Sequence, residues 1–166
     1  AGLAHPARVG LRRDRAAEVL QRVEQLGGDV LHAVLVAAHE ASADLAVEDR
    51  LPVVVARSAE EAAEAIDPFD RLLLVADGAV TDTDQLRSLA EAEGEMVLTV
   101  PDGGYGEIYE RIDGTTRWAG LAAISGALLR DTAGMLRDWD LQSTLLRRAL
   151  QGGARHVVAD GPVAIL

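Results

Sequence analysis

The stretch Arg71-Leu72-Leu73-Leu74-Val75-Ala76-Asp77-Gly78-Ala79-Val80-Thr81-Asp82 decides the fold. Its four consecutive large apolar residues predict a central parallel strand that is buried on both faces. The acid and the glycine that follow predict a loop at the carboxyl end of this strand, and Asp82, with Gln85 three residues later, predicts the start of a helix. Open α/β sheets bind ligands at the carboxyl ends of their strands, so Asp77 is the first candidate for a functional site.

Helices and strands alternate along most of the chain on either side of this stretch. Apolar spacing, capping residues and glycine stops predict helices at 12–26, 42–50, 58–66, 83–93, 126–136 and 140–151, with Ser58 and Asp140 as further capping residues. Apolar runs predict strands at 30–37, 52–56, 72–76, 96–100, 110–113, 117–124, 156–159 and 163–166. Alternation of this kind implies parallel strands with right-handed crossovers. We therefore predict an α/β fold, with one three-layer domain over residues 1–166 around a mixed, mostly parallel sheet.

The composition excludes several classes of function. A net charge of −11 over 166 residues works against a nucleic-acid partner, which would need a basic face. All 16 basic residues are arginine, so a phosphate-binding loop or a Schiff base that depends on lysine is excluded. The chain has no cysteine, and hence no disulfide, thiolate zinc site or cysteine nucleophile. With no long apolar run and no leader, the sequence predicts a cytoplasmic protein without a membrane partner.

Four residue clusters are candidates for chemistry. Asp77-Gly78 suits a divalent cation, because a carboxylate is a hard oxygen ligand and glycine lets a phosphate approach the backbone; the alternative is an acid that only opens a turn. Asp82 and Asp84 fit the start of a helix better than a metal site. The loop at 103–106 lacks the spacing of a dinucleotide fingerprint, and it is either a mobile loop beside a site or a surface turn.

The segment 110–118 is the fourth cluster. Arg111 and Asp113 alternate with Ile112, so on a strand they would share one face, either solvated or part of a site. Trp118 either packs in the core or lines a pocket, where it would be a substrate contact. His39 is the only histidine that follows a predicted strand end, and no Ser, His and Asp arrangement supports nucleophilic catalysis.

These motifs together resemble a nucleotide-diphospho-sugar transferase domain, the kind shared by GT-A glycosyltransferases and by nucleotidyltransferases acting on sugar or alditol phosphates. RLLLVADGAVTD resembles the central strand of that family, whose terminal acid holds nucleotide-bound Mg²⁺, and this implies a metal role for Asp77. The pair of segments ERID and RWAGLAAISGALL is similar to the family's sugar-binding segment, which implies a substrate contact for Glu110; Trp118 stands where the family commonly has Asn. The stretch from Trp139 to Leu166 resembles the late helix, turn and strand that precede the family's last acid, a role that would fall to Asp160 or Asp140. The resemblance thus implies Asp160 as a second metal ligand beside Asp77.

The sequence also departs from this family. Residues 1–11 show no counterpart of the opening strand and glycine-rich loop that cradle the phosphates. Two functions follow from the resemblance: transfer of a nucleotidyl group to a sugar or polyol phosphate with Mg²⁺, or a degenerate, non-catalytic relative that serves as a binding or assembly module. These departures from the family favour the non-catalytic relative. A nucleotide or sugar phosphate is the expected partner, and a homo-oligomer is compatible with either function. A phosphatase of the haloacid-dehalogenase type would need an acid where Val75 stands.

Overall fold

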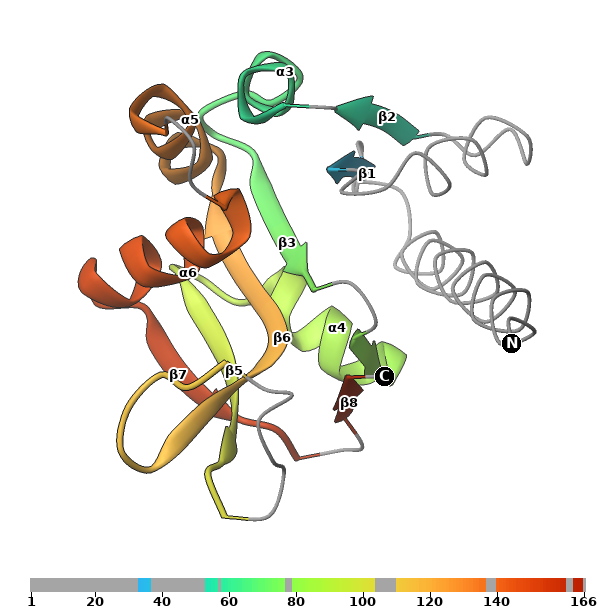
Figure 1. The fold of residues 1–166 in the computed structure, drawn as a ribbon. Coiled ribbons are helices and arrows are strands. Elements are labelled where there is room, and N and C mark those ends of the chain that lie inside the picture. Colours follow the sequence, from blue (N-terminus) through green and yellow to red (C-terminus); the bar gives the residue numbers. More distant parts are fainter. Residues whose placement is uncertain are drawn as a thin grey trace, which may run out of the picture. The chain divides into compact units, whose positions relative to one another are not determined.

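The computed structural model describes residues 33–36, 53–56, 58–76, 79–103, 110–136, 140–160 and 163–165 (Figure 1). The chain divides into two compact units, Ala1–Ala65 and Ile66–Leu166, and each is described here by itself. The helices predicted at 12–26 and 42–50 lie outside the described residues, as do His39 and Asp77. The prediction of one domain over the whole chain stays a prediction.

In the first unit, strands β1 (Ala33–Val36) and β2 (Val53–Ala56) pair in parallel, with Ala33 opposite Val53. Helix α3 (Ala59–Glu64) contacts both strands. Ser58 caps this helix, because its hydroxyl oxygen accepts a hydrogen bond of 3.1 Å from the Glu61 N–H. Both predicted strands and the predicted capping residue are confirmed.

The second unit is built on a four-stranded sheet in the order β3-β6-β5-β7. Its strands are β3 (Arg71–Val75), β5 (Met96–Pro101), β6 (Thr116–Ser125) and β7 (Arg155–Val158). Strand β6 is antiparallel to both β3 and β5, whereas β7 is parallel to β5. Three strands therefore run in one direction and β6 alone in the other, which confirms a mixed, mostly parallel sheet.

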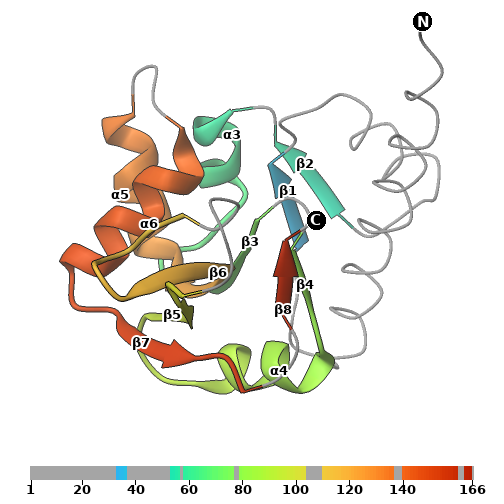
Figure 2. The ribbon, with the colours of Figure 1, turned by 60° about the horizontal axis from the view of Figure 1, so that its bottom comes forward.

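Helices cover both faces of this sheet. Figure 2 shows α5 (Gly126–Met135) and α6 (Leu141–Gln151) on one face and α4 (Thr83–Glu91) on the other. Large side chains from all three helices and from the central strands fill the core: Leu86, Leu89, Leu129, Leu145, Leu146, Val97, Leu98, Trp118, Leu121 and Ile124. The predicted caps form: Asp82 accepts from the Gln85 N–H, and Asp140 from the Ser143 N–H, both at 2.8 Å. Among the described helices, none has the length and apolar character to cross a membrane.

The structure corrects the sequence predictions at three places. The strand predicted to be central and parallel is β3, which among the described residues pairs only with β6 and runs antiparallel to it, and its residues Leu72 to Val75 are half-buried rather than buried on both faces. Residues 110–113 form a turn with a single bridge from Arg111 to Arg117 and not a strand. A short strand, β4 (Ala79–Thr81), was not predicted; it pairs antiparallel with β8 (Val163–Ile165) and is too short to show a pattern of its own.

Candidate functional site

One edge of the four-stranded sheet gathers the polar residues that follow strands. Because β3, β5 and β7 run the same way and β6 runs opposite, the carboxyl ends of three strands meet the amino end of the fourth. Ala76, Asp102 and Asp160 come just after β3, β5 and β7, and Glu110 lies in the turn that leads into β6. This is the edge at which α/β sheets bind ligands.

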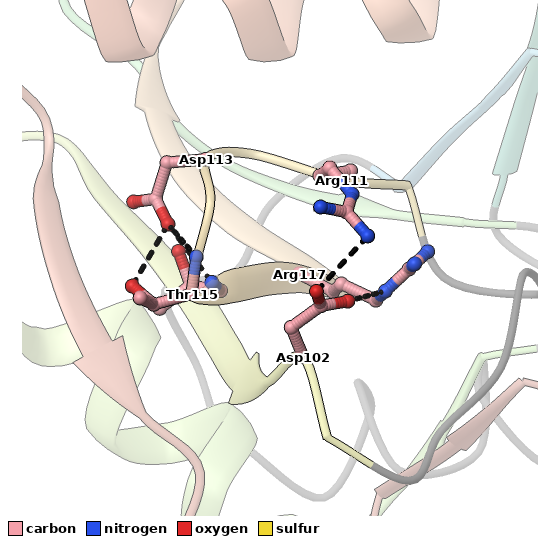
Figure 3. A network of polar contacts seen from close by, with 6 residues as sticks. Asp102, Arg111, Asp113, Thr115 and Arg117 are labelled. Atoms are coloured by element: carbon pink, nitrogen blue, oxygen red, sulfur yellow. Dashed lines mark hydrogen bonds and ion pairs between the residues drawn. The ribbon is translucent and has the colours of Figure 1, made fainter.

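A cluster of Asp102, Arg111 and Arg117 lies at this edge, and we call it the Asp102 cluster (Figure 3). Asp102 Oδ2 pairs with Arg111 Nη2 at 2.9 Å, and Oδ1 accepts a hydrogen bond from Arg117 Nε. The Arg117 side chain is only 12% exposed, whereas that of Arg111 is 55% exposed. Two guanidinium groups share one carboxylate, so the cluster carries one net positive charge, and Arg111 presents it to solvent.

The turn beside the cluster is fixed by Asp113. Its Oδ1 atom accepts hydrogen bonds from the backbone N–H groups of Thr115 and Thr116, both at 2.8 Å, and from the Thr115 hydroxyl at 3.0 Å. The Thr115 carbonyl in turn accepts a hydrogen bond of 2.8 Å from the Asp102 N–H. Hydrogen bonds from Thr115, first, and Thr116 favour the charged carboxylate and lower the pKa of Asp113 to about 2.

This pKa predicts how stability changes with pH. A carboxylate with a depressed pKa contributes stability that is complete above its unfolded pKa and is lost as the pH falls through its folded pKa. We expect the Asp113 contribution to be constant above about pH 4 and to disappear towards pH 2. The difference in thermal midpoint between wild-type protein and Asp113→Asn should therefore shrink over this range. A carboxyl ¹³C titration of Asp113 with a midpoint near its ordinary value would contradict the prediction.

Glu110, a predicted substrate contact, lies at this edge, half-buried between β6 and α6. Its Oε2 atom accepts a hydrogen bond of 3.3 Å from the Ser143 hydroxyl, and its backbone carbonyl accepts one of 2.8 Å from the Trp118 N–H. The first contact holds the Glu110 side chain against the first turn of α6, and the second holds its backbone against β6. The substrate role of Glu110 stays a prediction.

Trp118 is part of the core. The residue is 2% exposed, and its indole N–H donates a hydrogen bond of 2.9 Å to the Leu121 carbonyl. A substrate contact by Trp118 also stays a prediction, and it would require the ring to become exposed. Of the two residues considered for the last acid, Asp160 is exposed after β7, whereas Asp140 is the N-cap of α6.

The two predicted metal ligands follow strands that lie far apart. Asp77 itself lies outside the described residues, but Ala76 before it directly follows β3, and Asp160 follows β7. These strands are at opposite ends of the four-stranded sheet, and three strand spacings amount to about 14 Å. In the described part of the chain no group of three acidic or histidine side chains is placed to hold a metal ion. Asp102 is a poor cation ligand, since two arginines already neutralise it.

The chain is similar to known proteins in structure and not in sequence. No protein-family profile and no curated protein matches the sequence. A protein from Bacillus anthracis described as a glucose-1-phosphate thymidylyltransferase matches the structure with a TM-score of 0.58 at 9% identity, over 90% of this chain and 76% of that one. A protein from Thermus thermophilus described as a mannose-1-phosphate geranyltransferase matches with a TM-score of 0.51 at 12% identity, over 90% of this chain and 65% of that one.

The fold of this chain is similar to the folds of these two proteins. The resemblance seen in the motifs is thus confirmed for the fold, and the chain spans less than two thirds of the second of these proteins. The Asp102 cluster is the feature of this edge that sequence reasoning missed. The sequence marks Asp102 alone as a candidate, since it follows an apolar strand and precedes glycine, as Asp77 does, but it does not show the pairing of Asp102 with the two arginines.

Proposed function

We propose that this domain binds a nucleotide or a sugar phosphate at the carboxyl edge of its four-stranded sheet. The observation that carries the proposal is Arg111, a half-exposed guanidinium that Asp102 holds at 2.9 Å on this edge. A guanidinium fixed by one partner loses little conformational freedom on binding and is suited to grip a phosphate with two hydrogen bonds. The fold supports the same class of ligand, because both similar proteins bear names of enzymes that act on sugar phosphates.

The catalytic form of the proposal is transfer of a nucleotidyl group to a sugar or polyol phosphate. Arg111 would orient the phosphate and Glu110 would accept hydrogen bonds from a sugar hydroxyl. Asp77 would hold Mg²⁺, and the bound ion would offset the negative charge of the phosphates. Asp160 is the proposed second acid, and because it follows the strand at the opposite end of the sheet, its sharing of this ion needs a separate test. The cytoplasmic location expected from the lack of cysteine belongs to this proposal.

A binding module without turnover is the second candidate, and the composition favours it. The chain contains no lysine, so arginine alone can supply the cationic groups that stabilise charge on transferring phosphates. Loss of one such preorganised donor costs about 3–4 kcal/mol, or about 10²–10³ in rate. The expected result for the isolated chain is ligand binding with no useful release of pyrophosphate from nucleoside triphosphates.

Arg111→Gln tests the proposed phosphate site. Removing a charged donor should weaken binding of a nucleoside triphosphate or sugar phosphate about tenfold or more, as measured by calorimetric titration with a panel of both ligand classes. Arg87→Gln is the matched control: Arg87 is an exposed arginine on α4, where it pairs only loosely with Asp84, at 3.3 Å. Equal affinities for Arg111→Gln and wild-type protein would overturn the assignment of Arg111.

Asp77→Asn tests the proposed cation site. We expect wild-type protein to gain thermal stability with Mn²⁺ and nucleotide, by up to about 2.7 kcal/mol at a hundred times Kd, and the variant to lose most of this gain. Asp160→Asn, measured alongside, shows whether the second acid contributes to the same ion. An unchanged wild-type midpoint at millimolar metal would contradict any metal role. Pyrophosphate release that is present in wild-type protein and absent in Asp77→Asn would decide for the catalytic form.

A further inference from the structure

Strand β7 is the last strand of the four-stranded sheet, and in the described part of the chain no strand pairs with its outer edge (Figure 1). The N–H groups of Arg155 and Ala159 both donate to carbonyls of the β5 segment, at 2.9 Å. Alternate residues of a parallel strand bond to the same neighbour, so the N–H and carbonyl groups of His156 and Val158 point away from β5. Each copy of the chain therefore offers two N–H groups and two carbonyls at this edge.

The outer edge of β7 lacks the features that usually prevent one sheet edge from pairing with another. Exposed edges are commonly distorted by a bulge, blocked by proline or lined with charged side chains. The register of β7 with β5 has no shift, whereas that of β6 with β5 is broken by a bulge in β6 at Gly120. Of the four residues of β7 only Arg155 is charged, and Val158 is 63% exposed. The edge is thus regular and open to a further strand.

The free backbone groups of β7 match those of a second copy that runs antiparallel to it. When Val157 lies opposite Val157 of the second copy, His156 of each copy lies opposite Val158 of the other. Residues that face each other in this way exchange two hydrogen bonds. The two pairs give four intermolecular hydrogen bonds, which use all the outward N–H and carbonyl groups of His156 and Val158 in both copies. A twofold axis beside Val157 generates this arrangement, as in most homodimers.

The charges at the two ends of β7 favour the antiparallel direction. The strand begins with Arg155, and the exposed Asp160 lies two residues beyond its other end. In the pairing around Val157, Arg155 of each copy lies opposite Ala159 of the other, one residue from Asp160. Opposite charges therefore meet at both ends of the interface, whereas a parallel pairing in register would bring like charges together.

We propose that the outer edge of β7 is an interface at which two copies of this chain pair as antiparallel strands and join their sheets into one. An edge of four residues buries less area than the about 1,200–2,000 Å² of a stable complex. Each copy also carries a net charge of −11, which opposes association. We therefore expect a weak dimer, with a Kd of about 10⁻⁴ M. The inference involves no ligand and does not depend on the proposed phosphate site.

Self-association can be measured on the unliganded chain. Sedimentation equilibrium from about 10 µM to about 1 mM protein, in about 0.15 M salt to screen the net charge, should show a reversible dimer. The amide protons of His156 and Val158 should exchange about fourfold more slowly at the upper concentration than at the lower one. The amide of Val157, which faces β5, should show no such dependence.

Val158→Pro is the decisive variant, because it removes an outward N–H and leaves the hydrogen bonds between β7 and β5 in place. Proline is tolerated in an edge strand where its nitrogen faces solvent. This variant should raise the Kd of the dimer more than about tenfold. Val158→Thr is the matched control: it keeps the N–H and the β-branched shape, and it should change the Kd less than about threefold.

A wild-type chain that is monomeric throughout this concentration range would overturn the inference, and so would a dimer that Val158→Pro leaves intact. If Val158→Pro does not fold, Val158→Lys replaces it, since this side chain is exposed and a lysine on an edge strand opposes pairing. The expected rise in Kd for Val158→Lys is again about tenfold. An unchanged Kd would overturn the inference in the same way.

Discussion

Gly126→Ala is expected to lower the free energy of unfolding by about 3 kcal/mol, which corresponds to a fall in Tm of about 6–12 °C. A Cβ atom at this position would lie 2.0 Å from the Asp67 carbonyl oxygen and 3.0 Å from a methyl group of Ile66. Both are too close for van der Waals contact, and the nearer atom belongs to the backbone, which cannot rotate away. The loop before β3 would have to move.

Movement of that loop would break hydrogen bonds that cap α5. The Gly126 N–H donates to the Asp70 carbonyl at 2.7 Å, and the Ala127 N–H donates to the Pro68 carbonyl at 3.0 Å. These N–H groups belong to the first turn of the helix, which has no partners within the helix itself. The Ser125 hydroxyl, which accepts from the Leu128 N–H at 3.2 Å, would be left as the cap.

Gly134→Ala is the matched control for this prediction. Gly134 lies in the same helix, is exposed, and would place its Cβ in open space. Alanine is favoured over glycine within helices, so this variant should gain about 0.5 kcal/mol. Chemical denaturation of the two variants would show opposite changes. A Gly126→Ala protein as stable as wild type would contradict the close packing of α5 on the 66–70 loop.

Arg71→Met is expected to cost about 2 kcal/mol, because it removes the cap at the carboxyl end of α4. The Arg71 guanidinium donates three hydrogen bonds to backbone carbonyls: to Leu89 and Ala90 at 3.1 Å each, and to Gly94 at 2.7 Å. The last turn of α4 has no basic residue of its own, so a strand residue supplies the positive charge that favours this helix end. Partial burial lowers the pKa of Arg71, yet the group stays charged.

Arg87→Met serves as the control, since it removes an arginine from α4 whose partner Asp84 is almost fully exposed. Exposed pairs of this kind contribute less than about 0.5 kcal/mol. Thermal unfolding should therefore show a larger fall in Tm for Arg71→Met, which loses a helix cap, than for Arg87→Met, which loses only a charge. Equal midpoints for the two variants would show that the three carbonyls find other donors without cost.

Features that depend on a few neighbouring residues could be predicted from the sequence. Ser58, Asp82 and Asp140 each cap a helix as predicted, because the cap joins a side chain to a backbone N–H three residues later. The apolar runs likewise marked most of the described strands correctly. Whether the apolar residues Leu72 to Val75 form an edge strand or a central strand could not be predicted, since that depends on which strands lie beside them.

Features that depend on pairing between distant segments could not be predicted. The position of β6 between β3 and β5 follows from contacts across long stretches of chain, and so does the bulge at Gly120. The Asp102 cluster forms because the bridge from Arg111 to Arg117 brings both arginines to the end of β5. The alternating charges at residues 110–113 do not indicate which distant residues will pair with them.

The order of strands also bears on how the second unit folds. β5 and β6 form a hairpin-like pair whose closing residues, Pro101 and Thr116, are near in sequence, whereas the closing residues of the β3–β6 pair, Val75 and Leu121, are much farther apart in sequence. The entropy lost in closing a loop grows with its length, so β5 and β6 should associate first and β3 should dock later. Gly126→Ala acts on the late contact, and it should mainly accelerate unfolding while leaving the refolding rate nearly unchanged.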